Sequence, residues 1–248
     1  CETVRYPHND MVALDRILTE RRSLYEGVLI VADGVFSMSG EVADLPGLVR
    51  VASKHCCKLY IDDAHGLGVL GDRGRGTGSH FGLATEIDLV MGTFSKSFAS
   101  IGGFVAGDAD TIHYIRHKAR PFMFSAAMPP SAVATVLECM NVIEEEPEIF
   151  ERLWRNARYM KRGFQNLGFN TLKSETPIIP IVIGEDMKAF AFTKALYDHG
   201  VFATPVVSPA VSPGMALIRT SYMATHTQDD LDYVLDVFKK LGHEFGII

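Results

Sequence analysis

A lysine, an aspartate and a histidine follow apolar runs that are typical of buried strands. Lys96 comes shortly after the run Ile87–Met91, and the run Lys58–Ile61 leads into Asp62 and His65. In an open α/β sheet, the carboxyl ends of neighbouring strands border the ligand crevice. The sequence therefore predicts an amine, a carboxylate and an imidazole close together at one edge of a sheet.

This set of groups suits pyridoxal phosphate (PLP) chemistry. A lysine amine forms a Schiff base with the PLP aldehyde, and a carboxylate keeps the pyridine nitrogen protonated so that the ring accepts electrons. Thr93 and Ser95 flank Lys96 with hydroxyls that can hold phosphate or phenolate oxygens. A Schiff-base lysine needs a lowered pKa, from desolvation or nearby positive charge. The alternative is an exposed loop lysine, the commonest situation for this residue type.

The Asp62–His65 pair has two other interpretations, half of a metal site or a strand-end turn. The metal interpretation lacks a well-spaced third ligand. Strand alternation predicts that Asp63 points away from Asp62. The glycine-rich stretch Gly66–Gly76 matches neither a dinucleotide-binding fingerprint nor a P-loop, so we expect a turn that packs backbone near the site.

An arginine interrupts a second apolar run. Arg219 lies within Met215–Ser221, where a planar anion is its natural partner. An internal salt bridge is the alternative interpretation. His226, which follows shortly, is predicted to be structural.

Hydrophobic periodicity predicts the elements that position these residues. Asn9 is the expected N-cap of a helix with an apolar stripe from Met11 to Leu18. Apolar strands separated by helices imply a mostly parallel sheet covered by helices. Further elements are expected, in chain order, as strand Gly27–Ala32, helix Leu45–His55, strands Lys58–Ile61, Ile87–Met91 and Gly103–Gly107 (the last antiparallel), a helical region from Pro129 to Leu167 broken at Pro147, strand Pro177–Ile183, helix Lys188–His199, strand Met215–Ser221 and helix Thr227–Lys240.

The bulk composition limits the class of protein. The chain has 248 residues, 47% of them hydrophobic and 22% charged, as in soluble globular proteins. A net charge of −6 and the lack of a basic stripe argue against a nucleic-acid partner. No apolar run approaches the length of a transmembrane segment. Cys56 and Cys57 are adjacent, an awkward geometry for a disulfide, so a reducing, cytoplasmic setting is expected.

Taken in order, these motifs resemble the α-oxoamine synthase family of fold-type I PLP enzymes. One motif would be weak, but the ordered set is specific. The resemblance implies an α/β fold with a mostly parallel sheet between helices and a smaller α+β C-terminal domain. It implies that residues 1–135 are the C-terminal portion of the large PLP-binding domain and residues 136–248 the linking helix and small domain. The markers are Asp33–Met38 with Gly40, Asp62–Gly66, Gly71–Gly76, Gly92–Lys96, Phe124-Ser125 with Pro129-Pro130, and Arg219 before Ala224–Thr227.

The resemblance also implies roles for single residues. Lys96 would hold PLP as a Schiff base and later move the substrate α-proton. Asp62 would pair with the pyridine nitrogen, and His65 would bond the phenolic oxygen and help to polarise the acyl thioester. Ser37 and Thr93 would bind further cofactor oxygens.

Two more positions resemble family residues that act across a subunit boundary or on the substrate. Ser125 resembles a position that reaches the phosphate of the neighbouring subunit's cofactor, which implies a homodimer with shared active sites. Arg219 resembles the clamp on the amino-acid carboxylate. The chain departs from several relatives in having Ser125-Ala126-Ala127 where they have Ser-Thr-Ser, which puts one phosphate contact in doubt.

The implied reaction joins an amino acid to an acyl-CoA with loss of CO2, giving a 2-amino ketone and CoA. The segments 95–103 and 205–211 look most like bacterial serine palmitoyltransferases, so serine is favoured. Sister enzymes that use alanine or glycine, namely 8-amino-7-oxononanoate synthase and 2-amino-3-ketobutyrate CoA ligase, remain alternatives. So do a fold-type I aminotransferase or lyase and a non-catalytic partner subunit, although the presence of Lys96 argues against the last.

The family's N-terminal part has no counterpart in this sequence. That part carries a glycine-containing phosphate loop and the ring that stacks on the cofactor. Its size would be on the order of a hundred residues or more. The resemblance therefore leads us to expect no activity from these 248 residues alone.

Overall fold

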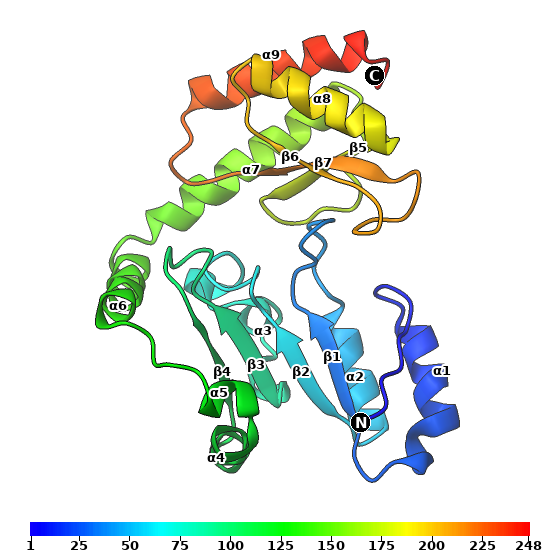
Figure 1. Ribbon diagram of the computed structural model, residues 1–248, viewed down its shortest axis with the longest axis vertical. Coiled ribbons are helices and arrows are strands. Elements are labelled where there is room, and N and C mark those ends of the chain that lie inside the picture. The colour runs from blue at the N-terminus through cyan, green and yellow to red at the C-terminus, as the bar shows by residue number, and fades with distance from the viewer. The chain divides into compact units, whose positions relative to one another are not determined.

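The first sheet has four strands (Figure 1). Two of these strands end at predicted site residues, Asp62 and Thr93. The computed structural model describes residues 1–248. The strand order is β1-β2-β3-β4, with the first three strands parallel and β4 antiparallel to β3. This confirms the predicted mixed sheet, including the reversed direction of its last strand. The bounds are β1 (Leu29–Asp33), β2 (Lys58–Asp62), β3 (Leu89–Thr93) and β4 (Gly103–Gly107).

Alternation along β1 and β2 gives this sheet one buried and one open face. Ile30 and Ile61 are 4% and 0% exposed, on the face near which α1 (Met11–Arg21) and α2 (Leu45–Lys54) pack. Leu29 and Val31 are 49% and 53% exposed. Helix α2 packs on the sheet through one apolar face, because its buried residues recur at helical spacing. These residues are Leu45, Leu48, Val51 and Ala52.

The first helix begins one residue later than the predicted cap implies. Asp10 is the N-cap, and its side chain accepts a hydrogen bond from the Ala13 amide at 2.9 Å. Asn9 instead has φ 53°, and its side chain accepts from the Asp44 amide at 2.9 Å. Asn9 as cap was therefore wrong. Both residue types favour caps, and the tertiary bond to Asp44 decides between them.

The first unit continues with helices that bury few of their apolar side chains. They are α3 (Thr77–Phe81), α4 (Ala109–Lys118), α5 (Arg120–Met123) and α6 (Pro130–Glu145). Three single 3₁₀ turns connect elements of this unit: η1 (Arg22–Leu24), η2 (Asp72–Gly74) and η3 (Ala84–Glu86). No residue of α4 or α5 is buried, and in α6 the buried residue is Val136.

A second sheet, antiparallel, forms the centre of the C-terminal region. Its order is β5-β7-β6. The predicted interruption of the long helical region is confirmed, because α7 begins at Glu148 directly after Pro147. The bounds are α7 (Glu148–Asn166), β5 (Ile178–Gly184), α8 (Asp186–Asp198), β6 (Thr204–Val206), β7 (Ala216–Ser221) and α9 (Gln228–Glu244).

Aromatic side chains fill the core of this region. Phe164, Phe192 and Phe238 are each fully buried. Phe238 meets the other two edge-to-face, with ring centroids 4.9 Å from Phe164 and 5.6 Å from Phe192. No helix of the structure combines the length and apolarity that a membrane crossing needs.

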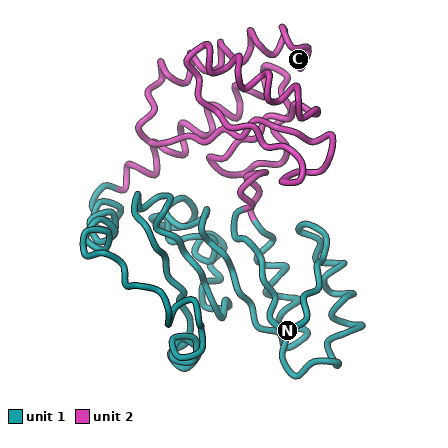
Figure 2. Tube along the Cα trace, in the orientation of Figure 1, with its two compact units in different colours: residues 1–35, 43–146 teal, residues 36–42, 147–248 magenta.

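The chain divides into two compact units (Figure 2). The first unit is Cys1–Val35 with Ala43–Glu146, and the second is Phe36–Val42 with Pro147–Ile248. Helix α6 therefore belongs to the first unit. The domain boundary at residues 135 and 136 stays a prediction.

Candidate functional site

Two aspartates lie side by side where β1 and β2 end. Asp33 is the register partner of Asp62 in the parallel pairing of these strands. Both lie on the open face of the sheet, because Ala32 and Ile61, which precede them, are buried. Asp62 keeps part of its surface exposed, and its Oδ1 accepts a hydrogen bond from the Ala64 amide at 3.1 Å. The carboxylate is therefore placed where the sequence predicted it.

Asp33 was not among the predicted site residues. Desolvation and then the neighbouring Asp62 raise the pKa of the Asp33 carboxyl, and the charge of Lys96 opposes this effect. Asp62 and Lys96 thus both lie within electrostatic range of Asp33. Strand register could have indicated Asp33, but register is not visible in an isolated apolar run.

Asp63 points to the other face of the sheet, as alternation predicted, and is 3% exposed. Its carboxylate accepts hydrogen bonds from the Thr77 amide at 2.7 Å and the Thr77 hydroxyl at 2.6 Å. Burial raises the pKa of Asp63, while the bonds from Thr77 act in the opposite direction. Asp63 is therefore an internal anchor that fixes the turn carrying Asp62 and His65.

Glycines crowd around this buried carboxylate. A Cβ placed on Gly66 would lie 2.0 Å from a carboxylate oxygen of Asp63, and one on Gly76 would lie 2.1 Å from the other oxygen. Gly76 also has φ +92°, which disfavours other residues. The glycine-rich stretch is thus a turn that packs closely around Asp63, in line with the prediction of a turn without phosphate-binding motifs.

His65 lies in this anchored turn and is half-buried. The amides of Gly66 and Leu67 both bond to the Asp63 carbonyl, at 3.1 and 2.9 Å. These bonds fix the backbone directly after His65. The imidazole is therefore carried by a rigid segment at the end of β2.

Lys96 is exposed and lies in a tight loop after β3. The loop is closed by backbone bonds from Ser100 to the Phe94 carbonyl at 2.8 Å and from Phe94 to the Gly102 carbonyl at 2.9 Å. Phe98, 6% exposed, anchors the loop in the protein interior. The backbone that carries Lys96 is therefore fixed, while its amine is accessible.

Hydroxyl groups surround the start of this loop. The Thr93 and Ser95 hydroxyls are hydrogen-bonded to each other at 2.9 Å. The Ser97 hydroxyl donates to the Leu67 carbonyl at 2.9 Å, which ties the lysine loop to the turn after His65. Thr93 and Ser95 thus form a small polar group at the end of β3, two strands away from β1.

Arg219 and Ser37 lie together in the second unit. The Arg219 Nε donates to the Ser37 carbonyl at 2.6 Å, and Nη1 donates to the Ser221 hydroxyl at 3.0 Å. These partners are a carbonyl and a hydroxyl, so the internal salt bridge is not the role of this arginine. Burial lowers the pKa of Arg219. Its Nη2 is the guanidinium nitrogen without such a bond.

Ser125 follows α5 and is exposed. Its hydroxyl donates to the Pro121 carbonyl within the same short segment. His226 accepts a hydrogen bond from the Met223 amide at 3.2 Å, as a structural histidine does. The first unit therefore carries Asp62, His65, Thr93, Ser95, Lys96 and Ser125, and the second carries Ser37 and Arg219.

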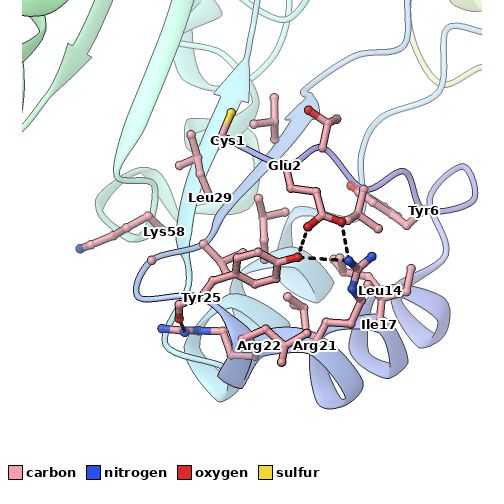
Figure 3. Close-up of a pocket in the computed structure, with 18 of the residues that line it drawn as sticks. Cys1, Glu2, Tyr6, Leu14, Ile17, Arg21, Arg22, Tyr25, Leu29 and Lys58 are labelled. Atoms are coloured by element: carbon pink, nitrogen blue, oxygen red, sulfur yellow. Dashed lines mark hydrogen bonds and ion pairs between the residues drawn. The ribbon is translucent and has the colours of Figure 1, made fainter.

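A cavity of about 1140 Å³ lies elsewhere, between the N-terminal segment, α1 and β1 (Figure 3). Glu2, Arg21 and Tyr25 point toward one another at its wall, where Glu2 forms an ion pair with Arg21 and accepts a hydrogen bond from Tyr25. None of the predicted site residues lines this cavity. The predicted chemistry therefore belongs to the strand ends and not to this hollow.

Comparison with known proteins gives close relatives along the whole chain. Serine palmitoyltransferase of Bacteriovorax stolpii is 54% identical over 245 residues, which are 99% of this chain and 58% of the relative. The 8-amino-7-oxononanoate synthase of Thermoanaerobacter pseudethanolicus is 45% identical over 247 residues, covering 100% of this chain and 62% of the relative. The chain thus spans about three fifths of the length of the relatives it matches.

Solved structures agree with these relatives. A serine palmitoyltransferase from S. paucimobilis, solved with a bound PLP–myriocin aldimine, matches with a TM-score of 0.94 and 35% identity, covering 100% of this chain and 63% of that one. An 8-amino-7-oxononanoate synthase from Francisella tularensis, at 22% identity and a TM-score of 0.80, supports the fold alone. These neighbours confirm the fold-type I architecture.

The model of the family described as aminotransferase class I and II matches residues 1–238. That range includes both sheets and every predicted site residue. The relatives above confirm the resemblance to α-oxoamine synthases that the ordered motifs indicated. On this evidence, the chain belongs to the aminotransferase class I and II family.

Proposed function

We propose that the protein containing this chain is a PLP-dependent C-acyltransferase. It joins an amino acid, with serine favoured, to an acyl-CoA and releases CoA and CO2, leaving a 2-amino ketone. The observation that carries the proposal is the pairing of an accessible lysine on a rigid loop after β3 with an aspartate at the end of neighbouring β2. The similarity to serine palmitoyltransferase over the whole chain supports the choice of reaction.

The side chains at the strand ends have the chemistry that PLP requires. Lys96 offers an amine for the aldehyde, and Asp62 offers a carboxylate for the ring nitrogen. Thr93 and Ser95 offer two neighbouring hydroxyls that can form hydrogen bonds with oxygen atoms of the cofactor. When bound, PLP supplies an electron sink that stabilises negative charge on the substrate α-carbon. The donor set therefore fits this cofactor.

The remaining roles belong to the chain's own residues. Lys96 moves the substrate α-proton at its Nζ, for which its exposed position and fixed backbone are suitable. His65 holds a cofactor oxygen and orients the acyl thioester. In the second unit, Ser37 contributes a cofactor contact and Arg219 binds the amino-acid carboxylate through its free Nη2 edge.

A homodimer with shared sites is part of the proposal, with Ser125 reaching the cofactor phosphate of the partner subunit. An exposed apolar surface around Ser125 supports this arrangement. Phe122, Met123 and Phe124 are 61%, 53% and 80% exposed, and α6 adds Leu137 at 57%. Side chains of this size rarely stay exposed without a partner. A second copy would cover them.

Two finer proposals follow from the sequence. We place the protein in the cytoplasm, because all four cysteines are unpaired, as in a reducing compartment. We also propose that residues 1–135 are the C-terminal portion of the large PLP-binding domain and that residues 136–248 are the linking helix and the small α+β domain.

A spectral titration tests the reaction. PLP-loaded full-length protein is titrated with serine, alanine and glycine, and visible absorbance is followed together with CoA release from an acyl-CoA. A saturable shift with serine and release of CoA support the proposed enzyme. A preference for alanine or glycine assigns a sister activity, which the 45% identical 8-amino-7-oxononanoate synthase makes the second candidate.

Other outcomes would contradict the proposal. Amino-group exchange with a keto acid and no CoA release would indicate an aminotransferase. A protein that binds no PLP in its full-length form would be a non-catalytic subunit. Asp62→Asn should bind PLP but lose most turnover, and near-normal turnover would remove Asp62 from its proposed role.

A further inference from the structure

The loop that carries Lys96 contains a strained backbone position. Ala99 has φ 47°, in the left-handed region that residues other than glycine rarely adopt. Its amide donates to the carbonyl of Lys96 at 3.1 Å, so the strained residue closes the turn that begins at the lysine. Such a conformation costs free energy and persists only where surrounding contacts hold it. The contacts that hold Ala99 therefore also fix the backbone of Lys96.

Ser100, the residue after Ala99, makes two of these contacts. Its amide donates to the Phe94 carbonyl at 2.8 Å, across the turn. Its hydroxyl donates to the Ala132 carbonyl at 3.0 Å, in the first turn of α6. The side chain is half-buried, which limits the access of water to this second bond. One serine thus ties the lysine loop both to its own start and to a separate helix.

Helix α6 contacts the same loop on the other side of the strained residue. The Cys139 thiol donates to the Phe98 carbonyl at 3.5 Å. Phe98 is 6% exposed, and its ring meets that of Phe94 edge-to-face with centroids 5.7 Å apart. A thiol is a weak donor, so the hydroxyl of Ser100 is the stronger side-chain hydrogen bond between α6 and the loop. Ala99 is therefore held between two fixed neighbours.

We propose that Ser100 is a positioning residue for Lys96, because its hydroxyl holds the lysine loop closed against the strain at Ala99. In the closed loop the backbone of Lys96 is fixed, and without the hydroxyl the strain favours opening. This inference deepens the proposed function, on which the role of the Lys96 amine rests. The balance between the hydrogen bond and the strain needs no cofactor.

Hydrogen–deuterium exchange of the cofactor-free, full-length protein measures this balance in residues 94–102. Ser100→Ala should lower the protection factors of the Ala99 and Ser100 amides roughly three- to tenfold, since a hydrogen bond that opposes opening is lost. Ala99→Gly should raise the protection of the loop about threefold, because glycine adopts this φ without strain. The double variant should recover most of the protection that Ser100→Ala loses.

Two further variants are controls. Ser131→Ala removes an exposed hydroxyl next to Ala132 on α6 and should leave the loop unchanged. Ser100→Thr keeps a hydroxyl and should retain the protection, and peptides of the second unit should exchange alike in all variants. Unchanged protection in Ser100→Ala would show that the hydroxyl does not hold the loop. A double variant as poorly protected as Ser100→Ala would show that strain at Ala99 is not what the hydroxyl opposes. Either result would overturn the proposal.

A measurement with PLP connects the loop to the lysine amine. Each full-length protein is loaded with PLP and diluted, and the decay of the visible chromophore is followed. Because opening of the loop displaces Lys96, Ser100→Ala should speed the decay by about the same factor as it speeds amide exchange, and Ala99→Gly should reverse this in the double variant. Equal decay rates in all variants would overturn the link to Lys96. An unchanged protein that forms no chromophore would contradict the proposed function, and amide exchange would then decide the role of Ser100 in the loop.

Discussion

The second unit hides its apolar side chains, whereas the first exposes many of them. Phe164, Phe192 and Phe238 have no exposed surface in the second unit. In the first unit, every residue of β4 is exposed, and Val31 and Phe124 are 53% and 80% exposed. The two units therefore differ in how much of their apolar side-chain surface they bury by themselves.

Apolar residues therefore have different roles in the two units. In the second unit, apolar residues stabilise a closed core around three strands. In the first, the residues with reactive groups lie on strand ends next to apolar surface that its own helices leave open. The second unit buries its core as a small independent domain does, while the first unit has exposed apolar surface that suits further protein contacts. The predictions below test this distinction.

The largest effect is expected at Lys96. Lys96→Ala should abolish the visible absorbance of the PLP-loaded protein and lower turnover by about 10³-fold or more, because its amine is the group that we propose holds the cofactor. The free energy of unfolding should change little, since the Lys96 side chain is exposed. Lys173→Ala, at an exposed lysine of the second unit, is the control. A retained chromophore in Lys96→Ala would contradict the site assignment.

Paired phenylalanine truncations compare the units directly. Phe238→Ala should lower the free energy of unfolding by about 3–5 kcal/mol, because it empties the centre of an aromatic cluster. Phe124→Ala, at a side chain that is 80% exposed, should change it by less than about 0.5 kcal/mol but weaken self-association. Urea unfolding and sedimentation measure the two effects. Equal losses of stability would contradict the proposed difference in apolar burial between the two units.

A pair of glycine substitutions separates backbone strain from close packing. Gly82 has φ +67° and open space around its Cβ position, so Gly82→Ala should cost about 1 kcal/mol. Gly76 has φ +92° and lies against Asp63, so Gly76→Ala should cost on the order of 2–4 kcal/mol. Urea unfolding of the two variants gives the comparison. A cost at Gly76 no larger than that at Gly82 would show that the turn relaxes around Asp63.

The smallest effect is expected at the arginine of the second unit. Arg219→Ala should raise the amino-acid KM about tenfold, equivalent to about 1.4 kcal/mol of lost binding, with little change in the acyl-CoA KM. Ser221→Ala removes one partner of the guanidinium and should have a smaller effect in the same direction. Steady-state kinetics of the full-length protein distinguish these cases. Equal changes in both KM values would contradict a carboxylate clamp.

Local pattern was enough to predict the strands that carry the site. The apolar runs before Asp62 and Lys96 are β2 and β3, and the reversed β4 was expected. The break at Pro147 followed from the missing amide of proline. Short or weakly patterned elements were missed: α4 buries no side chain, and β6 is three residues long. Neither leaves a periodic signal.

Contacts between distant residues could not be predicted from pattern. The bond from the Asp44 amide to Asn9 decides the cap of α1, and it joins positions 35 residues apart. The pairing of Asp33 with Asp62 depends on strand register, which many alignments of two apolar runs would satisfy. The bond from Arg219 to Ser37 spans 182 residues and was equally hidden.

That last bond has a practical consequence for dissecting the protein. Phe36–Val42 lies early in the chain but belongs to the second unit. Within it, the Gly40 carbonyl accepts hydrogen bonds from the Glu175 amide at 2.9 Å and the Thr176 hydroxyl at 3.0 Å. Residues 147–248 expressed alone would leave these two donors and the Arg219 Nε without their acceptors. A soluble fragment of the second unit therefore requires a circular permutation or a fused copy of residues 36–42, and a simple truncation would damage the proposed carboxylate clamp.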